Sequence, residues 1–229
     1  MKQSFDIKLY DGHLIINENG KDILVDTGSP VTLSRDTDFL FMGVHHHVAT
    51  NAGGHTVEDL AQLMNYPFDV LLGMDIMSSL SVFVDYRNKQ ISFSDEGFDY
   101  DGFSELNIQK GMLGAITIPL TVKGYLMNFA LDTGAKISYV DDKCVSSEIP
   151  VEERDDFNPL VGHYTTSIFD MQAMIGNTLF PVRFGILPHS LSMPLKMMGI
   201  DGVIGYDLFA AFTVIMDFKS NSLFYKRGF

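Results

Sequence analysis

The sequence predicts an all-β fold built from two related lobes, and three observations lead to this prediction. The tripeptide Asp-Thr-Gly occurs at 26–28 and again at 132–134, each time after an apolar run of strand type. A pair of apolar residues followed by glycine also occurs twice, ending at Gly73 and Gly205. The segments after these glycines then align without a gap. Self-similarity of this length indicates two copies of one structural unit.

The first copy is dominated by strand signals. Residues 7–16 alternate unevenly between apolar and polar side chains, and the sequence Asn-Glu-Asn-Gly at 17–20 is typical of a turn. Residues 23–25 are apolar and lead directly into Asp26. We therefore expect a hairpin whose second strand ends at this aspartate.

The second copy repeats the pattern. Residues 115–122 are apolar and β-branched, and residues 126–131 lead into Asp132. The end of each copy predicts a further hairpin, with turns near 87–89 and 219–221.

Helical signals are few and short. Apolar residues within 56–65 recur with helical spacing, and Thr56 with Asp59 resembles a capping box. Asp75 and Asp207 each precede a short segment of helical character, and we expect each of them to cap a first turn.

The repeat divides the chain into two lobes of similar size. We predict a first lobe at 1–94 that carries Asp26 and a second lobe at 106–229 that carries Asp132. The acidic, glycine-containing stretch 95–105 is predicted to link them.

Composition limits the classes of partner. The 229 residues are 46% hydrophobic and 20% charged, a normal balance for a folded protein with a core. A formal charge of −13 argues against nucleic acid or an anionic membrane as partner. The single cysteine excludes an intramolecular disulfide. The first residues lack the apolar segment of a signal peptide, and no run has the length of a membrane span, so we expect a cytoplasmic protein.

A pair of nearby carboxylates has a defined chemistry. Two carboxyls that share a proton cannot both ionise cheaply, so their titrations separate. The ionised member can take a proton from a bound water while the protonated member donates to a carbonyl. The glycine after each Asp-Thr permits a tight turn, which brings backbone close to the carboxylate.

The chain resembles the pepsin- and retropepsin-type aspartic peptidases over nearly its whole length. The resemblance rests on Asp26-Thr27-Gly28-Ser29 with 71–73, and on Asp132-Thr133-Gly134-Ala135 with 203–205. It implies a bilobal, pseudo-twofold acid-protease fold with two small β-barrel-like lobes and short helices. It also implies an aspartic endopeptidase in which Asp26 and Asp132 are the catalytic pair.

The same resemblance implies supporting roles. Thr27 and Thr133 would exchange hydrogen bonds across the junction of the lobes, and the hydroxyl of Ser29 would bond to Asp26. Ala135 has no such hydroxyl. Because one hydrogen bond to an ionised carboxylate is then missing, we expect a higher pKa for the pair and a weakly acidic to neutral working range.

A peptide or protein substrate would lie extended in the cleft between the lobes, beneath a hairpin flap. The glycine turn at Asn51, Ala52, Gly53 and Gly54 favours the first lobe as the source of this flap, whereas the helical pattern that follows argues against it. Residues 160–175 of the second lobe are the other candidate. We expect a monomer, binding of pepstatin-type inhibitors and no cofactor.

Two other interpretations were weighed. The run His45-His46-His47 would alternate its side chains in a strand and has no carboxylate or cysteine cluster nearby in sequence, so no metal site is expected. A non-catalytic peptide-binding module on the same fold is the alternative function. The presence of both aspartates and both threonines argues against it.

Overall fold

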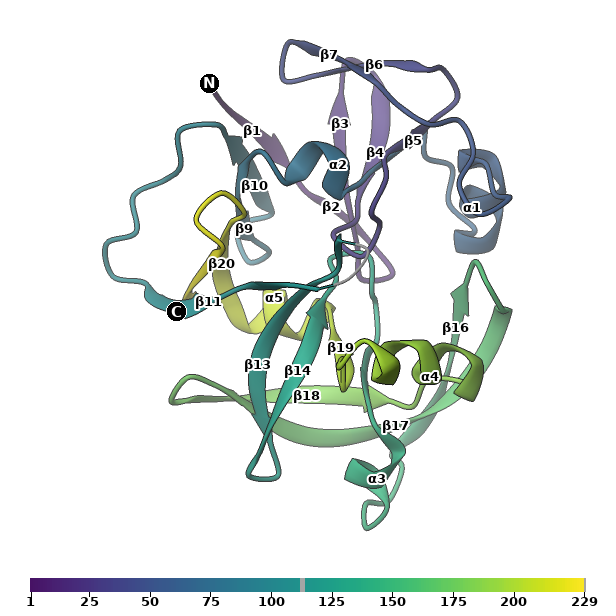
Figure 1. The fold of residues 1–229 in the computed structure, drawn as a ribbon, viewed down its shortest axis with the longest axis vertical. Helices are drawn as coiled ribbons and strands as arrows, with labels where there is room; N and C mark the ends of the chain where they lie inside the picture. The colour runs from purple at the N-terminus through teal and green to yellow at the C-terminus, as the bar shows by residue number, and fades with distance from the viewer. Residues whose placement is uncertain (112–113, 229) are drawn as a thin grey trace.

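Strands from the two halves of the chain form two lobes, one above the other in Figure 1. The computed structural model describes residues 1–111 and 114–228. Strands account for 50% of the chain and helices for 14%, which confirms the predicted all-β class. Both termini lie on the same side of the molecule, away from α1 (Val57–Met64) and α4 (His189–Met197).

A five-stranded sheet with the order β2-β3-β4-β8-β5 forms the centre of the first lobe. Its strands are β2 (Lys8–Tyr10), β3 (His13–Glu18), β4 (Lys21–Val25), β5 (Leu33–Ser34) and β8 (Val70–Leu72). A separate hairpin, β6 (Asp38–Phe41) and β7 (Val44–His47), contains the three consecutive histidines.

An eight-stranded sheet with the order β12-β13-β14-β19-β15-β18-β17-β16 forms the second lobe. Its strands are β12 (Gln109–Lys110), β13 (Ile116–Val122), β14 (Tyr125–Leu131), β15 (Ser138–Val140), β16 (Glu152–Asn158), β17 (Gly162–Ile175), β18 (Thr178–Gly185) and β19 (Gly202–Ile204). An additional pairing of β13 with β17 curls the sheet towards a barrel.

The two lobes use the same central pairing. In the first lobe β4 lies parallel to β8, and in the second lobe β14 lies parallel to β19. The backbone N–H of Asp26 donates to the carbonyl of Leu72, and that of Asp132 donates to the carbonyl of Ile204, each at 3.0 Å. The repeated apolar-apolar-glycine segment is therefore the strand that holds the Asp-Thr-Gly turn in both lobes.

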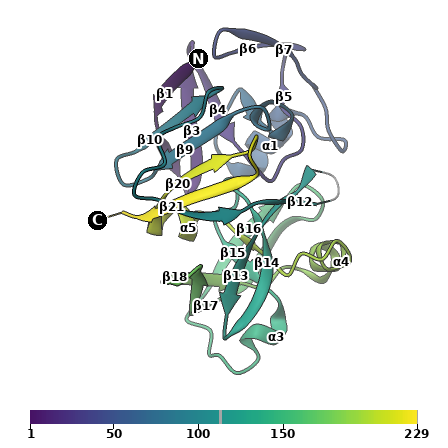
Figure 2. The same cartoon turned by 60° about the vertical axis from the view of Figure 1, so that its left-hand side comes forward.

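A third sheet of six strands contains strands from both halves of the chain, as Figure 2 shows from the side. Its order is β1 (Lys2–Asp6), β10 (Gln90–Ser94), β9 (Ser81–Asp85), β20 (Phe212–Asp217), β21 (Ser222–Arg227) and β11 (Ser104–Asn107). The predicted turns at 87–89 and 219–221 join β9 to β10 and β20 to β21. Antiparallel pairing of β9 with β20 joins the two repeats directly.

Residues 95–103 of the acidic stretch connect β10 to β11 of this shared sheet, and residues 104–105 already belong to β11. Tyr100 stacks on Phe224 with ring centroids 4.0 Å apart and donates its hydroxyl to Asp217 at 2.9 Å. The stretch thus packs on the second repeat, and the lobe boundaries at either end of it stay a prediction.

The predicted helix at 56–65 is α1, and its capping box is present. The hydroxyl of Thr56 accepts from the N–H of Asp59 at 3.3 Å, and the N–H of Thr56 donates to the Asp59 carboxylate at 2.8 Å. The remaining short helices are α2 (Met74–Met77), α3 (Asp142–Val145) and α5 (Tyr206–Ala211).

The predicted capping role of Asp75 and Asp207 is wrong. Glycine occupies the cap position of α2 and α5, and each aspartate lies inside the first turn. Asp75 accepts a hydrogen bond from the hydroxyl of Thr32, and Asp207 accepts one from that of Ser138, both at 2.6 Å. Each hydroxyl in turn accepts from the N–H of the cap glycine. The repeated aspartates therefore hold neighbouring strands together behind the Asp-Thr-Gly turns.

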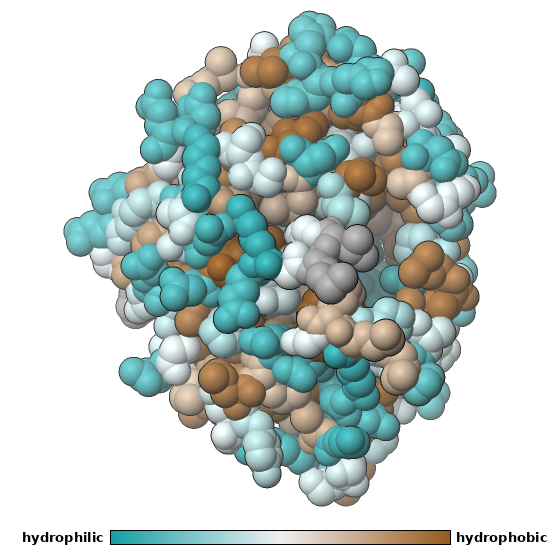
Figure 3. Space-filling model, in the orientation of Figure 1, coloured by the Kyte–Doolittle hydropathy of each residue, from teal (hydrophilic) through white to brown (hydrophobic). Residues whose placement is uncertain are grey.

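The main apolar core extends through both lobes and the shared sheet. A second apolar cluster lies between the five-stranded sheet and α1, and includes Leu60, Met64 and Phe68. Figure 3 shows one face of the molecule as a mosaic of hydrophilic and hydrophobic residues. None of the helices formed by the described residues combines the length and the apolar character that a bilayer span requires.

Candidate active site

Asp26 and Asp132 occupy equivalent turns, each directly after a central strand of its lobe. Oδ1 of Asp26 accepts from the N–H of Gly28, and Oδ1 of Asp132 accepts from the N–H of Gly134, both at 2.8 Å. The N–H of Ser29 adds a bond of 3.1 Å to Asp26. These bonds fix the direction of both carboxyls.

Each turn packs against the carboxyl of the other lobe. A Cβ atom on Gly28 would stand 2.4 Å from Oδ2 of Asp132, and one on Gly134 would stand 2.7 Å from Cγ of Asp26. Side chains larger than hydrogen do not fit at such distances. The absence of a Cβ at both glycines thus brings the two carboxyls face to face.

Thr27 and Thr133 connect the two turns through buried hydrogen bonds. The N–H of each threonine donates to the hydroxyl of the other at 3.0 Å. Each hydroxyl donates in turn to a carbonyl of the opposite lobe, at Leu131 and Val25 respectively, at 2.8 Å. These four hydrogen bonds fix the position of one Asp-Thr-Gly turn relative to the other.

The substitution Thr27→Val is expected to destabilise the protein by about 2–3 kcal/mol, because the N–H of Thr133 and the carbonyl of Leu131 lose their buried partner. Urea unfolding of the variant measures this loss. Thr50→Val is the control, since Thr50 is exposed and its change should stay within about 0.5 kcal/mol. Equal stability of the two variants would contradict a structural role for the exchanged bonds.

The pKa values of both carboxyls are raised by their surroundings. Burial raises the pKa of Asp26, while hydrogen bonds to Asp132 and to the N–H groups of Gly28 and Ser29 act against this rise. Burial, and then the negative charge of Asp26, raise the pKa of Asp132 well above its usual range. The pair therefore titrates in two steps, and one of its protons is kept to higher pH.

The Ser29 hydroxyl donates to the carbonyl of Val31 at 2.8 Å, in place of the predicted bond to Asp26. The Asp26 oxygen on that side already accepts two backbone N–H groups. The missing hydroxyl at Ala135 therefore does not distinguish the two carboxyls, and the expected working range cannot rest on it. Burial raises the pKa of both aspartates, and the negative charge of Asp26 adds to the rise at Asp132.

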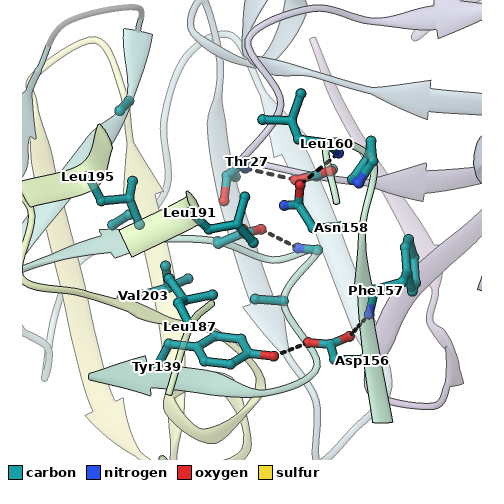
Figure 4. Close-up of a pocket in the computed structure, with 18 of the residues that line it drawn as sticks. Thr27, Tyr139, Asp156, Phe157, Asn158, Leu160, Leu187, Leu191, Leu195 and Val203 are labelled. Atoms are coloured by element: carbon teal, nitrogen blue, oxygen red, sulfur yellow. Dashed lines mark hydrogen bonds between the residues drawn. The ribbon is translucent and has the colours of Figure 1, made fainter. Parts of the chain in front are cut away.

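Both aspartates line a cavity of about 530 Å³, a volume in the range of small-ligand pockets. On the side of the first lobe its wall includes Leu60, Met64 and Phe68. Figure 4 shows Leu187, Leu191, Leu195 and Val203 gathered on the side of the second lobe. The aspartates thus open into a mainly apolar space between α1 and α4.

The hairpin formed by β16 and β17 lies along this cavity. Phe157, Asn158, Pro159, Leu160 and Tyr164 all contribute to its wall. In Figure 1 the tip of the hairpin reaches from the second lobe towards α1 of the first. Of the two candidate flap segments, residues 160–175 include part of this hairpin.

The other candidate, at Asn51, Ala52, Gly53 and Gly54, lies in the chain just before α1. The N–H and carbonyl groups of Ala52 and His55 bond to each other at 3.0 Å in both directions, which closes a tight turn. Within 1–111 and 114–228, the structure does not bring these four residues to the cavity that Asp26 and Asp132 line.

The polar residues of this cavity that sequence reasoning missed include His13, Lys136, Tyr139 and Asp156. The hydroxyl of Tyr139 donates to the carboxylate of Asp156, and Figure 4 shows the two side chains pointing at each other. These four residues come from three separate segments of the chain and belong to no common motif. Only Lys136, directly after Asp-Thr-Gly-Ala, carried a positional signal.

His13 is 4% exposed, and its Nδ1 has no hydrogen-bond partner among the described residues. Burial, and then the positive charge of Lys136, lower its pKa from 6.5 to about 4. The imidazole is therefore neutral over most of the acidic range.

This lowered pKa predicts a pH-dependent stability. Between pH 6.5 and about 4 the unfolded chain binds a proton at His13 and the folded protein does not, so the folded state loses stability as the pH falls. Relative to His13→Gln, the wild type should lose up to about 3 kcal/mol across this window. Unfolding free energies of both proteins at several pH values measure the difference. A difference that does not vary with pH would contradict the neutral buried imidazole.

No group of three or more His, Cys, Asp or Glu side chains among the described residues is arranged to hold a metal ion. The imidazole of His45 instead bonds to Asp38 on the paired strand at 2.9 Å.

Comparison with known proteins identifies the fold. No family model matches the chain, and no curated protein matches it. Among solved structures, the aspartic proteinase of Irpex lacteus superposes with a TM-score of 0.60 at 11% identity, over 99% of this chain and 97% of that one. The protease of Simian Foamy Virus (mac) covers 40% of this chain and 90% of its own, with a TM-score of 0.31 at 13% identity. The first of these matches confirms the predicted bilobal aspartic-protease fold.

Proposed function

We propose that the chain is an aspartic endopeptidase that hydrolyses peptide bonds with a water held between Asp26 and Asp132. The observation that carries this proposal is the pair of carboxyls, presented face to face by equivalent turns at the wall of an apolar cavity. Because the pair titrates in two steps, one carboxyl is ionised while the other is protonated over the same pH range, which supplies one base and one acid.

The ionised Asp26 takes a proton from the water, whose oxygen attacks the carbonyl carbon of the substrate. Asp132 gives its proton to the carbonyl oxygen, so that a neutral tetrahedral intermediate forms. The proton taken up by Asp26 then passes to the amide nitrogen as the C–N bond breaks. The intermediate hydroxyl returns its proton to Asp132, and both aspartates regain their starting states.

An extended peptide is the substrate form that suits this site. The hairpin of β16 and β17 runs along the cavity, and β16 is the last strand of its sheet, so its outer edge is available for strand pairing. The apolar walls favour apolar side chains near the cleaved bond. Pepstatin-type inhibitors are expected to occupy the same space.

Cleavage of a peptide library between pH 3 and pH 8, read by mass spectrometry with and without pepstatin, tests the proposal. Pepstatin-sensitive cleavage by the wild type, absent from Asp26→Asn, is the expected result. If the folded wild type cleaves nothing at any pH but retains peptides on an affinity column, the chain is a peptide-binding module and the proposal fails.

A further inference from the structure

Lys136 connects three segments beside the two aspartates. It directly follows the second Asp-Thr-Gly-Ala turn, and its Nζ lies 2.8 Å from the Asp11 carboxylate in the turn between β2 and β3. The same Nζ lies 3.9 Å from the carboxylate of Asp156 in β16. One side chain thus reaches the first lobe, the turn of Asp132 and the hairpin that lines the cavity.

The side chain of Lys136 is less exposed than those of two other paired lysines in the second lobe. Its side chain is 17% exposed, whereas those of Lys123 and Lys196, which also form ion pairs in the second lobe, are 34% and 40% exposed. Water weakens exposed pairs strongly. The Asp11 carboxylate is 65% exposed, so water screens its pair with Lys136, whereas the Asp156 carboxylate is 9% exposed and its contact with Lys136 is the enclosed one.

The turn at Asp11 packs directly on Lys136. Gly12 has a φ of +86°, and a Cβ at this position would stand 3.1 Å from the Cβ of Lys136. A side chain at Gly12 would therefore be strained and crowded. This close approach of the two backbones keeps the Asp11 carboxylate within reach of the ammonium group of Lys136.

Asp156 provides the anchor on the hairpin. Its side chain is 9% exposed and accepts hydrogen bonds from the hydroxyl of Tyr139 and from the N–H of Phe157 at 2.9 Å. The hydroxyl of Tyr164, on the second strand of the hairpin, donates to that of Tyr139 at 2.9 Å. Lys136 is the cation that faces this enclosed carboxylate.

Phe157, the residue after Asp156, provides a contact between the hairpin and the first lobe. Phe157 packs against the apolar cluster of the first lobe, and its ring centroid lies 6.1 Å from that of the neutral His13. The hairpin of the second lobe is thus seated on the first lobe by an apolar contact on one side of Asp156 and by Lys136 and Asp11 on the other.

We propose that Lys136 is a positioning residue that holds the hairpin of β16 and β17 closed over the cavity by bridging Asp11 and Asp156. Without the positive charge of Lys136, the enclosed carboxylate of Asp156 has no cation beside it. The hairpin then separates from the first lobe more often. The effect on catalysis rests on the proposed peptidase function. The effect on the hairpin itself does not.

Hydrogen exchange of the hairpin amides tests the bridge without any substrate. In Lys136→Met, exchange at residues 152–168 should be about tenfold faster than in the wild type, and exchange in β13 and β14 should not change. Lys136→Arg keeps the charge and should restore slow exchange. The control is Lys123→Met, which removes the ion pair with Glu148 elsewhere in the second lobe and should leave the hairpin unchanged.

Steady-state kinetics on a cleaved peptide provide the second measurement. Because Lys136 does not touch the reacting atoms, Lys136→Met should raise KM by about 5–10-fold and change kcat by less than about threefold. In an Asp156→Asn background no enclosed charge needs neutralising, so the same substitution should raise KM less.

The two proposals fail separately. If the wild type cleaves no peptide, the proposal of a peptidase function is wrong. Hydrogen exchange still tests whether Lys136 bridges Asp11 and Asp156. Hairpin exchange in Lys136→Met equal to that of the wild type overturns the bridge, whatever the cleavage assays give. The bridge also fails if Lys136→Arg exchanges as fast as Lys136→Met, because the charge would then not be the cause.

Discussion

Asp26→Asn and Asp132→Asn are each expected to reduce peptide cleavage by at least about 10²–10⁴-fold, the contribution of positioned acid–base groups. An amide can neither take the proton of the water nor return a proton to the leaving group. Cleavage of one library peptide at the optimal pH measures the loss. Asp38→Asn, which changes an exposed aspartate in β6, is the matched control and should keep wild-type activity.

The same two substitutions should stabilise the fold at neutral pH by about 1–2 kcal/mol, as is common when a strained functional group is removed. The pKa of each carboxyl is raised in the folded state, so the folded protein carries the cost of a buried charge above that pKa. This cost disappears as the pH falls and the carboxyl protonates, so the advantage of the variants should shrink in acid. Thermal unfolding at several pH values measures it. Variants that are inactive and also less stable at neutral pH would indicate that the pair is structural.

Gly28→Ala and Gly134→Ala should each lower activity by about 10²-fold or more, since displacement of a reacting group by about 1 Å costs this much. The new methyl group at 28 would stand 2.4 Å from the carboxyl oxygen of Asp132, and the one at 134 would meet Asp26. Each aspartate would be pushed out of the pair by a residue of the opposite lobe. Turnover of a cleaved peptide, with KM and kcat separated, measures the effect.

Gly228→Ala is the control for this pair of substitutions, because an added Cβ there makes an ordinary contact of 3.9 Å with Arg87. Circular dichroism establishes that the variants fold. Wild-type turnover by folded Gly28→Ala would mean that the carboxyls do not meet across these glycines in the working protein.

Local features of the fold were predictable from the sequence because near neighbours decide them. An apolar run followed by Asp-Thr-Gly specifies a strand that ends in a tight turn, and such a strand is found before Asp26 and before Asp132. The capping box of Thr56 and Asp59 likewise needs only residues three positions apart. These elements lie where the sequence predicts them.

Roles that depend on distant partners were not predictable. Asp75 and Asp207 have the sequence context of helix caps, yet each accepts a hydroxyl from a strand far away in the chain. The hydroxyl of Ser29 likewise bonds to Val31, because backbone N–H groups already occupy the nearer oxygen of Asp26. Several groups compete for each of these hydrogen bonds, and which group forms the bond depends on how the whole chain packs.

The sequence by itself determined that two equivalent units each present an aspartate, Asp26 and Asp132, after a strand, and the resemblance to aspartic peptidases implied that the two meet. Tertiary structure alone decided what surrounds them. It brings the β16–β17 hairpin to the cavity, and it gathers His13, Lys136 and Asp156 from three separate segments. The reason is physical: a motif fixes backbone geometry over a few residues, whereas contacts between segments depend on which surfaces pack together when the whole chain is folded.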